Sequence, residues 1–229
     1  PPVLATAMYV EADGARLFVE VAGDGPPLLS IPGSGSALTD RTSPSASPLA
    51  EHFTVASYDH RGLGRSASRD RPLTMADFTT DAFAIADALG WSSFRVLGPS
   101  FGGMVAQNMA VTQPSRITCL VLCCTSAGGA GGSSYPLHER PDPLTSLALI
   151  DTRPGMLGDM ANLFAGREVP SEPGYERQLQ ARRGHDCGDL LPIVTAPTLV
   201  CSGRYDAIAP PENGVALTSR IPGARHELF

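Results

Sequence analysis

Residues 96–103 read Val96-Leu97-Gly98-Pro99-Ser100-Phe101-Gly102-Gly103 and place the pattern G-x-S-x-G between two segments of different character. An apolar run over residues 94–97 precedes the pattern, and a helical pattern over residues 104–112 follows it. In a strand-to-helix turn the serine is pushed out of the backbone, and small residues on both sides let neighbouring backbone pass closely. The helix behind it offers free N–H groups and a partial positive charge that suit a developing oxyanion. The stretch therefore predicts a nucleophilic serine, with a glycine-rich loop carrying an incidental serine as the alternative.

The composition is that of an ordinary globular protein. The 229 residues are 42% hydrophobic and 17% charged, which suits one α/β domain with an insertion. A net charge of −6 argues against a nucleic-acid partner, because phosphate binding needs clustered Lys and Arg. No apolar stretch approaches the length of a membrane span, and residues 1–4 do not resemble the start of a signal peptide. We therefore expect neither a nucleic-acid partner nor a membrane partner.

The cysteine pattern bears on compartment and metal binding. The five cysteines are odd in number, form no C-x-x-C pair and lie mostly in apolar runs that resemble strands. This pattern predicts buried free thiols in a reducing compartment, and hence a cytoplasmic protein, rather than a metal site or a disulfide framework.

Strand and helix patterns alternate along most of the chain. Residues 7–12 and 16–21 alternate around Asp13-Gly14, which predicts a hairpin. Thr74 with Asp77 three residues later predicts the start of a helix that Gly90 ends. Further strands are predicted at residues 27–31, 53–58, 94–97, 117–124, 197–201 and 224–229, and further helices from residue 101 and over 211–220. Apolar strands alternating with helices predict an α/β fold, a mostly parallel twisted sheet with helices on both faces.

Residues 127–191 do not continue this alternation of strand and helix patterns. They begin with a flexible glycine- and serine-rich run over 128–134, and helical patterns follow at 144–150, 156–164 and 175–183, interrupted by prolines. We predict a core of residues 1–126 and 192–229, with 127–191 as a helical cap over the ends of the strands.

Four ordered motifs carry a family resemblance over nearly the whole chain. They are I-P-G-S-G-S at 31–36, Y-D-H-R-G-L-G-R-S at 58–66, G-P-S-F-G-G at 98–103 and A-P-T-L-V-C-S-G-R-Y-D-A-I-A-P-P at 196–211. In this order they resemble the α/β-hydrolase superfamily. Within it the chain is most similar to small bacterial esterases and lactonases, such as 3-oxoadipate enol-lactonase and aclacinomycin methylesterase.

The resemblance implies a role for each of four residues. Ser100 would be the nucleophile, and the backbone N–H groups of Phe101 and Ser34 would form the oxyanion hole. Asp206 would be the acid of a triad ordered Ser, acid, His along the chain. The alternative for Asp206 is an aspartate that caps its own turn before Pro210. No metal or organic cofactor is implied.

The resemblance places the catalytic histidine in a loop after the last strand, and the sequence ends at Phe229. We therefore expect that the last loop and helix are missing, and that a polypeptide ending at Phe229 has little or no esterase activity. His226 is the alternative base, although its own segment has the pattern of an edge strand. His60 either lines the pocket or is structural; Asp59 and Arg61 beside it can bond the backbone and each other. The remaining histidines are His52, a helix-end residue, and His138 and His185, both in the cap.

The leading hypothesis is a serine hydrolase that cleaves a small, fairly apolar carboxylic ester or lactone through an acyl-enzyme on Ser100. A cofactor-free haloperoxidase (perhydrolase) or a C–C bond hydrolase would use the same triad. A hydrolase fold that binds a small ligand without catalysis is the alternative from another class. The sequence leaves the oligomeric state open.

Overall fold

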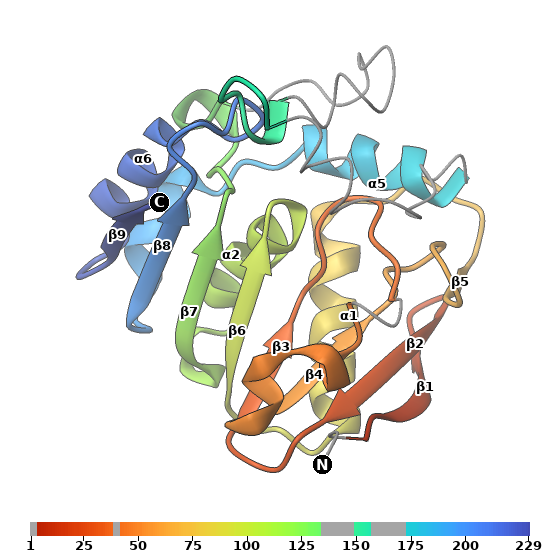
Figure 1. Cartoon of the computed structure of the whole chain (residues 1–229). Coiled ribbons are helices and arrows are strands. Elements are labelled where there is room, and N and C mark those ends of the chain that lie inside the picture. Colours follow the sequence, from red (N-terminus) through yellow and green to blue (C-terminus); the bar gives the residue numbers. More distant parts are fainter. Residues whose placement is uncertain (1–3, 39–41, 134–148, 157–172) are drawn as a thin grey trace.

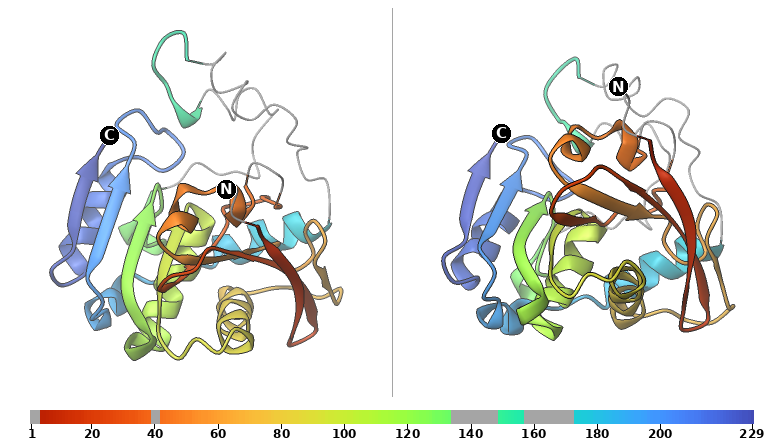
Figure 2. Two further views of the ribbon diagram at one scale, coloured as in Figure 1. Left: turned by 60° about the horizontal axis from the view of Figure 1, so that its bottom comes forward. Right: turned by 90° about the horizontal axis from the view of Figure 1, so that it is seen from below.

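The amino-terminal hairpin forms one edge of the sheet. The computed structural model describes residues 4–38, 42–133, 149–156 and 173–229. β1 (Thr6–Ala12) and β2 (Ala15–Ala22) pair antiparallel around Asp13-Gly14, where Gly14 has a φ of +68°. β2 then pairs antiparallel with β4 (Thr54–Tyr58) and with the two-residue strand β5 (Ala67–Ser68), which was not predicted. Figure 2 shows the hairpin on the side of the molecule away from β8 and β9.

The rest of the sheet is parallel. The strand order is β1-β2-β4-β3-β6-β7-β8-β9 (Figure 1). The parallel strands after β4 are β3 (Pro27–Ser30), β6 (Phe94–Pro99), β7 (Ile117–Cys123), β8 (Thr198–Ser202) and β9 (Arg225–Leu228). Their carboxyl ends therefore meet at one edge of the sheet, where open α/β folds bind ligands. The predicted α/β architecture is confirmed.

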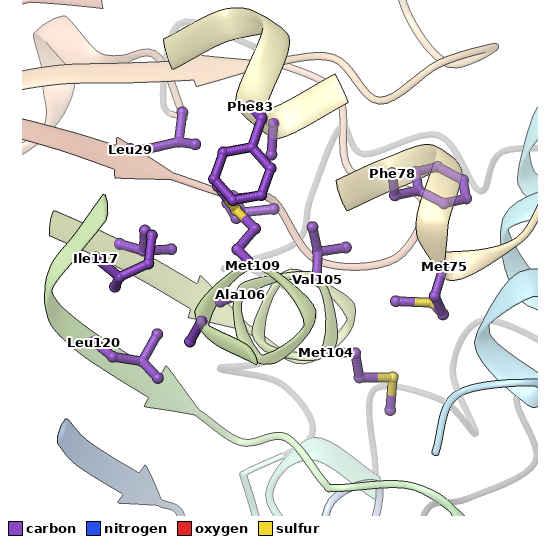
Figure 3. Packing of buried hydrophobic residues seen from close by; sticks show 14 of the residues in the cluster. Leu29, Met75, Phe78, Phe83, Met104, Val105, Ala106, Met109, Ile117 and Leu120 are labelled. Carbon is purple, nitrogen blue, oxygen red and sulfur yellow. The ribbon is translucent and has the colours of Figure 1, made fainter. Parts of the chain in front are cut away.

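Three α-helices pack on one face of the sheet. α1 (Met75–Ala88) begins where predicted, and the Thr74 N–H donates to the Asp77 carboxylate at 2.8 Å. α2 (Phe101–Thr112) lies at the centre of the core, between α1 and strands β3 and β7 (Figure 3). α6 (Glu212–Arg220) packs against β8 and β9. None of the helices within the described ranges is long and apolar enough to cross a membrane.

The opposite face of the sheet is less completely covered. The short 3₁₀ helices η1 (Pro44–Ala46) and η2 (Pro48–Glu51) contact β4, while side chains of β6, β7 and β8 on this face are half-buried. The prediction of buried thiols is therefore wrong for four of the five cysteines. Cys187 is buried, whereas Cys119, Cys123, Cys124 and Cys201 are half-buried because they lie on or beside this face. All five are free thiols.

The segment predicted as a cap is described in part. It contains η4 (Gly129–Gly131), α5 (Pro173–Arg183) and η6 (Gly188–Ile193). α5 matches the helical pattern at 175–183, while the patterns at 144–150 and 156–164 lie largely outside the described residues. Figure 1 shows α5 running across the carboxyl ends of the strands. η6 packs on α2 and α6, so that Cys187 and Leu191 join the main hydrophobic core.

The motif at 58–66 ties the loops at this edge together. The carboxylate of Asp59 accepts hydrogen bonds from the Leu38 N–H at 2.6 Å and the Arg65 N–H at 2.8 Å. Arg61 does not pair with Asp59; its guanidinium makes two 2.6 Å hydrogen bonds to Asp81 on α1. Both partners of this ion pair are fully buried, so the pair fixes the loop to the helix.

Candidate active site

Ser100 occupies the turn between β6 and α2 in a strained conformation. Its φ of 51° and ψ of −118° lie outside the regions that residues with a side chain usually adopt. Such a conformation costs about 1–3 kcal/mol and persists only when its surroundings enforce it. Here the Ser100 N–H donates to the Cys123 carbonyl at 2.8 Å, and the Ser100 carbonyl accepts from the Thr125 hydroxyl at 2.7 Å. These bonds to the end of β7 hold the serine at the tip of the turn.

Glycines beside the serine let three backbone segments meet. A Cβ at Gly102 would lie 2.8 Å from the Pro32 carbonyl oxygen and closer still to the Ile31 oxygen. A Cβ at Gly98 would lie 2.6 Å from the backbone nitrogen of Gly103. Both distances are shorter than atoms tolerate, so only glycine lets the turn approach the end of β3 this closely.

The backbone N–H groups predicted to form the oxyanion hole, those of Phe101 and Ser34, belong to two segments that meet at Ser100. The Phe101 N–H is at the first position of α2, where it has no partner within the helix. The loop after β3 passes next to the turn, since a Cβ at Gly33 would lie 3.7 Å from the Ser100 Cβ. Ser34 follows Gly33, and within the described residues neither its N–H nor that of Phe101 donates to another group. Both N–H groups are therefore unpaired donors in the part of the chain that the structure describes.

Two buried side chains hold the loop that carries Ser34. The His60 Nε2 lies 2.9 Å from the Pro32 carbonyl, and the Gly35 N–H donates to the Gln178 Oε1 at 2.7 Å. Burial lowers the pKa of His60 to about 4, so the ring is neutral and Nε2–H is the donor to Pro32. His60 also packs edge-to-face against the rings of three aromatic residues, Tyr58, Phe78 and Phe101. His60 is thus a structural residue that sets the position of the loop.

Asp206 lies in the loop that follows β8. Its Oδ1 accepts hydrogen bonds from the N–H groups of Ile208 at 2.8 Å and Ala209 at 2.9 Å. Partial burial raises the pKa of Asp206, while these two N–H donors and the Cys124 thiol act in the opposite direction. The two backbone bonds fit the turn-capping alternative.

The end of β7 connects the serine to the aspartate. On one side the Cys123 carbonyl accepts from the Ser100 N–H, and on the other the Cys124 N–H donates to the Cys201 carbonyl at 2.8 Å. Ser100 and Asp206 follow β6 and β8, which both flank β7. The two predicted site residues therefore lie at the same edge of the sheet, on either side of Cys124.

His226 is turned away from this edge. Its Nε2 lies 3.0 Å from the Ser202 hydroxyl, and the ring faces Gly214 on α6. The side chain therefore lies in the layer between the sheet and α6.

The other histidines are also engaged or placed elsewhere. His185 is buried, with Nδ1 3.2 Å from the Asn108 amide and Nε2 3.3 Å from the Ser126 carbonyl. His52 follows η2 and precedes β4, which places it at the amino-terminal end of the strands. None of the four histidines in the described residues binds Asp206, and His138 lies outside them.

Sequence reasoning missed two residues at this site. Cys124 follows an apolar strand next to that of Ser100, and this position was a signal that it would lie at the same edge. Gln178 left no comparable signal, because only the packing of α5 across the strand ends brings it to the loop. Within the described ranges no group of His, Cys, Asp or Glu side chains could hold a metal ion.

Known proteins resemble the chain along nearly its whole length. A family model described as "alpha/beta hydrolase fold" matches residues 26–171. Serine hydrolase BPHL of Mus musculus is 28% identical over 239 residues, 98% of this chain and 78% of that protein. Rhodomycin D methylesterase DauP of a Streptomyces species is 28% identical over 266 residues, 94% of this chain and 88% of that protein. The crystal structure of an enol-lactonase from Burkholderia xenovorans superimposes with a TM-score of 0.79 at 25% identity, covering 97% of this chain and 91% of the other.

Proposed function

This chain belongs to the alpha/beta hydrolase fold family, and from that membership we propose that it is a serine hydrolase that cleaves a small carboxylic ester or lactone through an acyl-enzyme on Ser100. The observation that carries the proposal is the strained turn at Ser100. Its surroundings hold a serine at the tip of the turn, and in the described residues the neighbouring N–H groups of Phe101 and Ser34 have no hydrogen-bond partner, which supports their role as the oxyanion hole. A turn with no catalytic role has no need of a strained serine in this position.

The proposed reaction follows from this geometry. The Ser100 hydroxyl attacks the acyl carbonyl, and the N–H groups of Ser34 and Phe101 stabilise the negative charge that develops on the carbonyl oxygen. The leaving alcohol takes the proton that a base removed from Ser100, and water then hydrolyses the acyl-enzyme by the same route. Asp206 would orient the base and stabilise it when it is charged.

We infer that the base is an imidazole from outside the described residues. His60, His185 and His226 make other hydrogen bonds, and a serine hydroxyl is a poor nucleophile until a base takes its proton. The carboxyl end of β9 reaches the edge beside Asp206, because the Arg204 N–H donates to the Phe229 carbonyl at 2.8 Å. A histidine in a loop after β9 would therefore enter the site next to the acid.

The names of two similar proteins support the substrate class. One is a methylesterase and the other an enol-lactonase, and both names refer to a carboxylic ester or lactone. The free donors beside Ser100 suit the tetrahedral intermediate that acyl transfer from either substrate forms.

The test measures p-nitrophenyl acetate hydrolysis and fluorophosphonate labelling in the full-length protein, with mass spectrometry to locate the label. We expect the label on Ser100, and Ser100→Ala should lose labelling and at least about a thousandfold in turnover. Ser219→Ala is the matched control, because Ser219 is exposed on α6 and its hydroxyl bonds only the Ala216 carbonyl. His138→Ala should keep its activity if the base follows β9.

Two results would contradict the proposal. A folded protein that is not labelled at Ser100 would favour a small-ligand binder without catalysis. Hydrolysis that survives Ser100→Ala would place the chemistry on another residue.

A further inference from the structure

The side-chain amide of Gln178 is buried with only one of its two polar atoms bound. Gln178 lies on α5 and is 0% exposed. Its Oε1 accepts a hydrogen bond from the Gly35 N–H at 2.7 Å, which fixes the orientation of the amide, because only the oxygen can face an N–H donor. Its Nε2 has no hydrogen-bond partner within the described residues. Since both atoms are bonded to one carbon, the unpaired N–H donors lie beside the same loop as the bound oxygen.

A second polar group of this loop also lacks a partner. The hydroxyl oxygen of Ser34, the residue before Gly35, is buried and makes no hydrogen bond in the part of the chain that the structure describes. Folded proteins pair nearly all buried polar side-chain atoms, so an unpaired one calls for an explanation in function or in a bound molecule. Two such groups within one residue of Gly35 indicate that an oxygen atom of a ligand binds here.

The Gln178 amide has a fixed place close to Ser100. Figure 1 shows α5 running across the carboxyl ends of the strands. A Cβ at Gly174, the second residue of α5, would lie 3.0 Å from the Gly62 Cα, so the helix meets this loop at the level of the backbone. Gly33, which lies next to Ser100, and Gly35 are two residues apart and are separated by at most about 7 Å. A small ester held at Ser100 can therefore reach the amide.

The charge of the donor indicates the kind of oxygen that it binds. The Gln178 amide is neutral, and the neighbouring Arg177 pairs with Asp70 at 2.6 Å. A carboxylate buried at this position would need a cation to offset its desolvation, and Gln178 supplies none. An uncharged acceptor, such as a carbonyl oxygen, needs only the N–H donor.

We propose that Gln178 is a specificity-determining residue, whose Nε2 donates a hydrogen bond to a second, uncharged carbonyl oxygen of the ester or lactone substrate. The proposal rests on the proposed function, because it places the substrate at Ser100. The bond from Gly35 to Oε1 holds the amide in place before the substrate arrives. A purely structural role of Gln178 predicts instead that its substitution changes the rates for all esters by the same factor.

The experiment compares kcat/KM for two pairs of p-nitrophenyl esters in the full-length protein, 4-oxopentanoate with pentanoate and 5-oxohexanoate with hexanoate. We expect a preference of about tenfold for the keto ester of at least one pair, the discrimination that one hydrogen bond provides.

Two variants of Gln178 remove the donor in different ways. Gln178→Glu keeps an acceptor for the Gly35 N–H and loses both N–H donors, so the preference should fall to about one. Gln178→Met removes the acceptor as well, so the preference should be lost together with part of the rate for the plain esters. Gln180→Glu is the matched control, because Gln180 is exposed on the same helix, and it should keep the preference.

Each possible failure has its own signature. The role of Gln178 is overturned if the unmodified protein shows no preference in either pair, or if folded Gln178→Glu retains the preference. Stronger selection for the p-nitrophenyl monoester of adipic acid than for the keto esters would overturn the uncharged class of acceptor. Fluorophosphonate labelling of Ser100 without a keto preference keeps the proposed function and rejects only this proposal. Should Gln178→Glu not fold, Gln178→Met gives the same comparison without a buried charge.

Discussion

Substituting Gly102 by alanine tests the close approach of the turn to β3. The new Cβ would lie 2.8 Å from both the Ile31 carbonyl carbon and the Pro32 carbonyl oxygen. Non-bonded carbon contacts are comfortable at about 3.5–4.0 Å, so the two backbones must separate by roughly 1 Å. Both groups are backbone and neither can rotate away. We expect a loss of about 3 kcal/mol in the free energy of unfolding, the upper end of the usual cost of overpacking.

The same displacement should impair the site. Gly102 and Phe101 belong to one turn of helix, while Ser34 is carried by the loop that would be pushed away. A shift of about 1 Å in a catalytic group can lower the rate about a hundredfold. Gly102→Ala should therefore lose both stability and turnover, with KM less affected.

Urea unfolding followed by the fluorescence of Trp91, the single tryptophan, measures the stability change. A loss of about 3 kcal/mol corresponds to a fall in Tm of about 6–12 °C for a chain of this size. Gly184→Ala is the control, because a Cβ there meets only the Ala181 carbonyl at 3.5 Å. If Gly102→Ala unfolds within about 0.5 kcal/mol of the unmodified protein, as the control should, the close approach is refuted.

Three further predictions concern His60, Asp81 and Ser100. Burial lowers the pKa of His60 to about 4, so its ring takes up a proton more readily in the unfolded chain than in the folded one. The free energy of unfolding should therefore fall by about 3 kcal/mol as the pH drops from about 6.5 toward 4. His60→Phe should flatten this pH dependence in urea titrations, and the similarly shifted His185 accounts for the part that remains. Asp81→Ala removes both 2.6 Å bonds of the buried Arg61 and leaves it the longer 3.7 Å ion pair with Asp77, so it should cost about 3 kcal/mol by urea unfolding. Asp87→Ala, which removes the exposed partner of Arg116, should stay within about 1 kcal/mol, and equal effects of the two substitutions would contradict the burial of the Arg61–Asp81 pair. Ser100→Gly should raise the free energy of unfolding by about 1 kcal/mol through relief of the strained φ, while abolishing fluorophosphonate labelling, and a loss of stability would argue against strain at this position.

Much of the fold follows from short-range patterns in the sequence. The apolar runs around Val96, Leu120 and Val200 are strands because a sheet covered by helices buries such runs, and Thr74 starts a helix because its partner Asp77 is local. Two features depended on distant residues and were not foreseen. The pair between Arg61 and Asp81 forms because α1 packs against the loop, and β5 forms because β2 lies next to it.

The residues of the candidate site also fall into those that local motifs predict and those that depend on contacts between distant segments. Ser100, Phe101 and Ser34 were predicted from motifs in which the turn, the helix and the glycines are all local, and the structure brings them together. The bond between the Ser100 N–H and the Cys123 carbonyl joins the ends of two different strands, and the bond between Gln178 and Gly35 joins α5 to a loop. Neither contact has a local pattern, because each depends on how separate elements pack.

The strand order also bears on how activity is acquired during folding. Ser100 and Asp206 are separated by about a hundred residues, and parallel strands that pair across such distances form slowly. β8 must join β7 before the acid stands beside the nucleophile. A refolding chain would therefore regain the environment of Trp91, which packs against the core at the end of α1, before it regains turnover. The delay between the recovery of Trp91 fluorescence and the recovery of turnover would measure how long β8 takes to pair with β7.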